Sequence, residues 1–79
     1  MSPAEERACI LKAQGARLRE ERQRVGLTLE AMGALGNVTK HTQCNYEAGR
    51  NSPSLTYMVT VAKATRIDSH YVILGVRRT

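Results

Sequence analysis

Over the first 25 residues, apolar positions recur among polar ones at the spacing of an α-helix. Ser2, Pro3 and Glu5 form a helix start, because serine caps a first turn, proline fits it and glutamate completes a capping box. The positions at steps of three and four form one stripe: Ala8, Leu11, Gly15, Leu18, Arg22 and Val25. The pattern predicts a helix that ends at Gly26, with Gly15 as a candidate break into two pieces.

Four further helices are predicted downstream, each from a polar capping residue followed by apolar positions at helical spacing. The caps are Thr28, Thr39, Ser54 and Asp68. The second helix runs to about residue 35 and the third to about residue 48, and glycines stop the third and the fifth. No segment shows the alternation of a strand, so the chain is predicted to be all-α with five helices.

The expected core positions follow from the same spacing. Those of the fourth helix are Leu55, Met58, Val59, Val61 and Ala62. Those of the fifth are Tyr71, Val72 and Leu74. Gly33 indicates close backbone packing, because glycine inside a helix costs about 1 kcal/mol relative to alanine. Asn37 fits a turn that needs a positive φ, and residues 76–79 are expected to form a loose tail.

Composition narrows the class of protein. The chain has 79 residues, which predicts a single domain over residues 1–79. Its aromatic residues are three tyrosines, so the core must be largely aliphatic. Twelve Lys and Arg against seven Asp and Glu give a net charge of +5, which favours nucleic acid over membrane as the partner. Residues 26–50 are balanced, with two basic and two acidic groups, so the excess lies on either side.

No apolar run approaches the roughly 20 residues that a membrane span needs, and the N-terminus has no apolar signal segment. A cytoplasmic location is therefore expected, in a bacterium or a phage-infected host, with Cys9 and Cys44 as reduced thiols. The sequence predicts no cofactor, no small-molecule ligand and no membrane partner.

The predicted third helix has an unusual outward face. Thr42 and Tyr46 share one face, and the opposite face carries His41, Cys44, Asn45 and Ala48, with Lys40 at the N-terminal end. This outward face has hydrogen-bonding groups and no acid, whereas a face that is only solvated usually shows Glu–Lys pairs. Asparagine can bond adenine with two hydrogen bonds and lysine can donate to guanine, so the face is suited to reading bases.

An ordered set of segments resembles the Cro/C1-type helix-turn-helix family, which includes λ-like phage repressors and xenobiotic-response-element-type bacterial regulators. The segments are 26–33 (GLTLEAMG), 38–42 (VTKHT), 46–50 (YEAGR), 53–55 (PSL) and 71–75 (YVILG). The resemblance covers about residues 15–75. It implies a five-helix, λ-repressor-like DNA-binding domain in which helices two and three form the helix-turn-helix and helix three enters the major groove.

The resemblance also implies roles for individual residues. Lys40, His41, Cys44 and Asn45 match base-reading positions of the family, and Gln43 on the same helix is predicted to join them. Ala48, Arg50 and Ser54 match family positions near phosphates, and Thr28 and Thr39 are predicted phosphate contacts as well. The family places an Arg–Glu pair where this chain has Arg22 and Glu47, which predicts a structural ion pair, since a charge on a packing face needs a partner. The alternative for Arg22 is that its head group extends to water.

Three positions depart from the family pattern. Leu29 stands where the family often has a phosphate-binding glutamine, and Arg66 stands where a glycine commonly ends helix four. Gln43 stands at a position that is usually Ile or Val, so it either bonds locally or reaches DNA.

Other functions have weaker support. His41 and Cys44 are spaced as half a metal site that Cys9 and His70 would have to complete, but no CxxC or HxxxH accompanies them, so no metal is predicted. For Cys44 as a redox switch, the sequence shows no feature that would activate the thiol. No nucleophile motif or phosphate-binding glycine loop is present, so the chain is not expected to be an enzyme.

The sequence is interpreted as that of a DNA-binding transcriptional regulator, of the phage or prophage repressor type, acting as a homodimer on a palindromic operator. Helix five, the tail and Ile10 are the candidate dimer surface. Two alternatives remain open. One is a protein-interaction module of the same fold, an antitoxin or antirepressor, which the balanced charge of residues 26–50 favours. The other is the DNA-binding part of a longer repressor.

Overall fold

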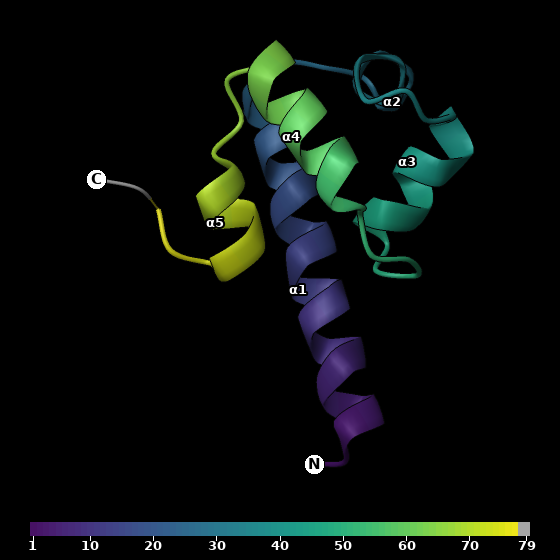
Figure 1. Cartoon of the computed structure of the whole chain (residues 1–79), viewed down its shortest axis with the longest axis vertical. Helices are drawn as coiled ribbons and strands as arrows, with labels where there is room; N and C mark the ends of the chain where they lie inside the picture. Colours follow the sequence, from purple (N-terminus) through teal and green to yellow (C-terminus); the bar gives the residue numbers. More distant parts are fainter. Residues whose placement is uncertain (78–79) are drawn as a thin grey trace.

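The computed structural model describes residues 1–77, and within them all regular secondary structure is helical (Figure 1). The helices are α1 (Pro3–Arg24), α2 (Leu29–Leu35), α3 (Lys40–Glu47), α4 (Leu55–Ala64) and α5 (Ser69–Leu74). The predicted all-α, five-helix fold is therefore confirmed. No helix in the described part of the chain combines the length and the apolar character needed to cross a membrane.

Local capping chemistry sets where each helix begins. The side chain of each predicted cap accepts a hydrogen bond from a backbone N–H in the first turn, which satisfies a donor that has no partner inside the helix. The five caps are Ser2, Thr28, Thr39, Ser54 and Asp68. At Ser2 the capping box with Glu5 is complete. The helix starts could thus be predicted from residues within one turn of each other.

The candidate break at Gly15 is absent, because α1 is continuous from Pro3 to Arg24. Gly15 is buried against α3, and a Cβ added to it would lie 2.5 Å from the carbonyl oxygen of Tyr46 and 2.6 Å from that of Glu47. The glycine lets the two helix backbones approach each other. Gly33 has the close packing expected of it, since its Cβ would lie 2.9 Å from the carbonyl oxygen of Val38.

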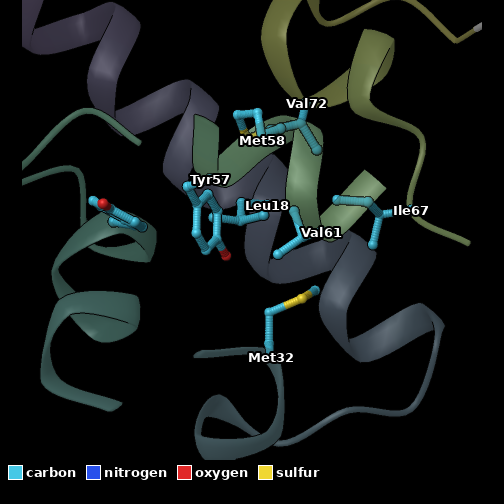
Figure 2. Packing of buried hydrophobic residues seen from close by; sticks show 8 residues of the cluster. Leu18, Met32, Tyr57, Met58, Val61, Ile67 and Val72 are labelled. Carbon is cyan, nitrogen blue, oxygen red and sulfur yellow. The ribbon is translucent and has the colours of Figure 1, made fainter. Parts of the chain in front are cut away.

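The core lies between α1, α2 and α4 and is closed by α3 and α5 (Figure 2). Its buried apolar residues are Leu18, Met32, Tyr46, Tyr57, Met58, Val61, Ile67 and Val72. The rings of Tyr46 and Tyr57 pack edge to face, with centroids 4.9 Å apart. Tyr57 on α4 is thus a packing residue, and it joins α4 to α3.

Two of the predicted core positions of α4 are wrong. Met58 and Val61 are buried as expected, but Leu55 is 81% exposed and Val59 is 54% exposed. Leu74 of α5 is also exposed, at 63%. Tyr57 takes the interior position that the apolar spacing had given to its neighbours, so α4 is rotated relative to the expectation.

The predicted loose tail is wrong for residues 76 and 77, whereas residues 78 and 79 lie outside the described part of the chain. The guanidinium of Arg77 lies 3.3 Å from the carboxylates of Glu20 and Glu21 and 4.0 Å from the ring centroid of Tyr71. Glu21 is fully buried and also accepts hydrogen bonds from Arg24 and from the backbone N–H of Asp68. These bonds, led by that from Arg24, lower the pKa of Glu21 to about 2.

Candidate nucleic-acid interface

The outward face of α3 has the residues that were predicted for it. Lys40, His41, Cys44 and Ala48 are exposed and Asn45 is half-buried. The opposite face of the helix is buried through Gln43 and Tyr46. Figure 1 shows α2 and α3 together at one side of the molecule, with α3 at its outer edge. An external surface could therefore approach this face of α3 without displacing another helix.

Gln43 does not share this face, so its predicted base-reading role is wrong. Its side chain is fully buried. Its amide nitrogen donates to Glu47 Oε2 at 2.8 Å, and its amide oxygen accepts from the hydroxyl of Tyr57. The local-bonding alternative is the one that the structure supports. The signal was in the sequence, because Gln43 is spaced three residues from Tyr46 and four from Thr39, on the packed side of the helix.

A bidentate ion pair fixes α3 to α1. Arg22 Nε lies 2.7 Å from Glu47 Oε2, and Nη2 lies 2.9 Å from Glu47 Oε1. The two side chains are only 10% and 5% exposed. Arg22 Nη1 also donates to the carbonyl oxygen of Leu27, just before α2. The hydrogen bond from Arg22 to Glu47 raises the pKa of Arg22, so the guanidinium stays charged in this site.

The ion pair continues through Gln43 to Tyr57, so one polar network connects α1, α3 and α4 beneath the outward face. Burial raises the pKa of Tyr57, which keeps its phenol protonated as a donor to Gln43. Within residues 1–77 no buried side-chain nitrogen or oxygen lacks a hydrogen-bond partner. A fully satisfied network of this kind restricts the orientation of α3 relative to the rest of the domain.

Asn45 and Arg50, which were predicted to have separate roles, contact each other. Arg50 Nη1 donates to Asn45 Oδ1 at 3.0 Å. The bond orients the amide group and leaves its NH2 donors and one oxygen lone pair available. Lys40 also has a neighbour, since its Nζ lies 3.7 Å from Glu30 Oε1, but both side chains are exposed and such pairs contribute little.

Three of the residues predicted for phosphate contacts are helix caps, and Arg50 follows α3 in the chain. Thr28, Thr39 and Ser54 are the caps of α2, α3 and α4, and each hydroxyl oxygen accepts a backbone N–H at 3.0 Å. Arg50 is exposed in the loop that joins α3 to α4. A cleft beside the outward face of α3, which no sequence pattern had indicated, measures about 190 Å³. It is lined by Arg19, Arg22, Leu29, Cys44, Glu47 and Ala48.

The two cysteines are separated in the fold. Cys9 is exposed on the first turns of α1, and Cys44 is exposed on α3. Among residues 1–77 no three His, Cys, Asp or Glu side chains gather closely enough to hold a metal ion. The geometry thus offers a hydrogen-bonding helix face on a rigid support.

A sequence profile of helix-turn-helix domains matches residues 14–70 of this chain, which is more than half of its length. The chain belongs to the helix-turn-helix domain family. The resemblance to Cro/C1-type regulators is confirmed, with α2 and α3 as the helix-turn-helix. Members of this family are DNA-binding transcriptional regulators.

Two solved structures share the arrangement of this helix-turn-helix protein. The clp gene regulator ClgR from C. glutamicum superimposes with a TM-score of 0.72 and 26% identity, over 82% of this chain and 84% of that chain. The restriction-modification controller protein C.AhdI from Aeromonas hydrophila gives a TM-score of 0.70 and 29% identity, over 82% and 97%. No curated protein sequence matches the chain.

Proposed function

We propose that this helix-turn-helix protein is a repressor of the phage or prophage type that binds a palindromic operator as a homodimer, with α3 in the major groove. The observation that carries the proposal is the outward face of α3, which is accessible, free of acidic groups and fixed by the buried network beneath it. An α-helix fits the major groove, and rigid support is needed for base edges to be distinguished. The regulator would act in the cytoplasm as a single domain.

In this proposal the two kinds of contact come from different parts of the surface. Lys40, His41, Cys44 and Asn45 meet base edges, with the amide of Asn45 oriented by Arg50. The caps of α2, α3 and α4 and the cation of Arg50 meet phosphates. Base contacts determine sequence preference, whereas phosphate contacts determine position and salt dependence.

Substitution of Asn45 and Arg50 should separate these roles. Asn45→Ala is expected to weaken operator binding by about 1–3 kcal/mol and to leave binding to random duplex nearly unchanged, because only hydrogen bonds to a base are removed. Arg50→Ala should weaken both and reduce the salt slope by about 0.9 for each phosphate that Arg50 neutralises. It should also slightly relax sequence preference, since it frees the Asn45 amide. The measurement is affinity for both duplexes across a salt series, after the operator is selected from a random library.

Matched controls are available on α1. Gln23→Ala removes an exposed amide outside α3, and Arg7→Ala removes an exposed cation near the N-terminus of α1. Neither should change sequence preference. Equal weakening of both duplexes by Asn45→Ala would show that α3 is not the reader. A wild-type protein with no sequence preference would favour the alternative function, an antitoxin or antirepressor module, which the balanced charge of residues 26–50 supports.

The homodimer is supported by an apolar surface on α4 and α5. Leu55, Val59 and Ile73 are exposed, and with Met58 and Ala62 they line a shallow depression of about 240 Å³. The exposed apolar side chains are adjacent and not scattered, which is typical of an interaction surface. This surface includes the predicted helix five, and it adds α4, whose Leu55 and Val59 were expected in the core.

Val59→Lys tests this surface without adding negative charge that would repel DNA. Burying an ammonium group in an interface is unfavourable, so the variant is expected to sediment as a monomer and to lose cooperative occupation of the two half-sites. Leu35→Lys is the control, because Leu35 is an exposed apolar residue on α2, outside this surface. The homodimer would be wrong if wild type stayed monomeric at micromolar concentration and saturated a single half-site one to one.

A further inference from the structure

The edge of α1 that borders α3 has two cations without a partner. Lys12 and Arg19 are exposed, and within residues 1–77 neither side chain makes a hydrogen bond or an ion pair. The other arginines in the second half of α1 do make such bonds: Arg17, Arg22 and Arg24. Lys12 and Arg19 are therefore available to an external anion.

Both cations lie beside α3. A Cβ added to Gly49 would lie 2.8 Å from the Cα of Lys12, so Lys12 is packed against the loop that follows α3. Arg19 lines the cleft of about 190 Å³ together with Cys44 and Ala48 of the α3 segment. Seven residues correspond to about two turns, so the two side chains emerge from the same face of α1, roughly 10 Å apart along its axis. We call Lys12, Arg19 and this cleft the α1–α3 seam.

The seam has a net positive charge. The ion pair on its floor is internally neutral, because Arg22 and Glu47 compensate each other. The nearest acids along the second half of α1, Glu20 and Glu21, are engaged by Arg77. Lys12 and Arg19 thus remain as uncompensated charges next to the helix that is proposed to enter the groove.

We propose that the α1–α3 seam binds the DNA backbone. Arg19 contacts one phosphate and Lys12 contacts a second phosphate of the same DNA strand, the one that borders α3. The proposal rests on the proposed function and extends its phosphate contacts from the helix caps and Arg50 to α1. Because the cations are about 10 Å apart, they cannot share one phosphate. The planar guanidinium of Arg19 can donate two parallel hydrogen bonds to phosphate oxygens, whereas Lys12 acts as a point charge.

The test is the salt dependence of binding to a mixed-sequence duplex, which requires no knowledge of the operator. Wild type, Arg19→Gln, Lys12→Gln and the double variant are compared with Arg7→Gln. Arg7 is an exposed cation on the same helix that also lacks a partner within residues 1–77, and it does not line the cleft. Five residues separate it from Lys12, so at 3.6 residues per turn it lies on a different face of α1. Each seam variant should reduce the salt slope by about 0.9 and the double variant by about 1.8, whereas Arg7→Gln should change it little.

Exposed side chains without partners can be replaced without disturbing the fold, and thermal melts of each variant check this. If Arg19→Gln and Lys12→Gln match Arg7→Gln while Arg50→Ala still reduces the slope, the seam proposal is overturned and the proposed function stands. If wild type binds no duplex at low salt, both are overturned. A reduced salt slope for Arg19→Gln and Lys12→Gln, with the slope of Arg7→Gln close to that of wild type, supports the seam proposal.

Discussion

Glu47→Gln is expected to lower the free energy of unfolding by about 3–5 kcal/mol, because it strands the buried guanidinium of Arg22. The Glu47 carboxylate accepts three hydrogen bonds, two from Arg22 and one from Gln43. An amide at this position would turn its own NH2 group toward one of these donors. Domains of this size have a total stability of only about 5–15 kcal/mol, so urea melts should be recorded in stabilising sulfate.

Substitution of the partner residue, Arg22→Met, should be destabilising as well. The double variant should lose less free energy of unfolding than the sum of the two single losses. The matched control is the exposed pair of Glu30 and Lys40, for which Glu30→Gln and Lys40→Met should each cost less than about 1 kcal/mol. Strictly additive losses at Arg22 and Glu47 would show that their interaction does not stabilise the domain.

Gly15→Ala is expected to destabilise the protein by about 1–3 kcal/mol, although alanine is the better helix former by about 1 kcal/mol. The added methyl group would lie 2.5 Å from the carbonyl oxygen of Tyr46, and this backbone cannot move without separating α1 from α3. Because α3 would shift, DNA affinity should fall together with stability. Urea melts and DNA titrations measure the two effects.

The neighbouring Ala16 is exposed on the same helix, so Ala16→Gly reports helix propensity alone and should cost about 1 kcal/mol. The sign of the Gly15→Ala effect is decisive. If Gly15 were only a weak point in α1, as the sequence alone suggested, alanine would raise the midpoint of the urea melt.

The helix boundaries could be predicted because their causes are local. Each cap bonds a backbone N–H within the first turn, and Gly75 terminates α5 in the left-handed conformation. The role of Gly15 could not be predicted in this way, since the atoms that require a glycine there belong to residues about thirty positions later. The contacts of Arg77 with Glu20 and Glu21 likewise join distant segments, so a tail that looked loose is held in place.

The candidate site shows the same division between local and distant causes. The period of α3 placed Lys40, His41, Cys44 and Asn45 on its outward side. For Gln43 the sequence left base reading and local bonding open, and its buried partners come from both α3 and α4. The contact between Asn45 and Arg50 depends on the path of the loop after α3, which the sequence pattern does not determine.

The position of α3 on DNA can be measured directly, because the chain has two exposed thiols in different places. Cys44 is on the proposed reading face and Cys9 is on the first turns of α1, which extend beyond the other helices (Figure 1). Alkylation by iodoacetamide, followed by mass spectrometry of the two peptides, reports the rate at each site. With nine-tenths of the protein bound to operator, Cys44 should react about tenfold more slowly, in proportion to the free fraction, and Cys9 should be unchanged. An unchanged rate at Cys44 in the bound protein would contradict the placement of α3 in the major groove.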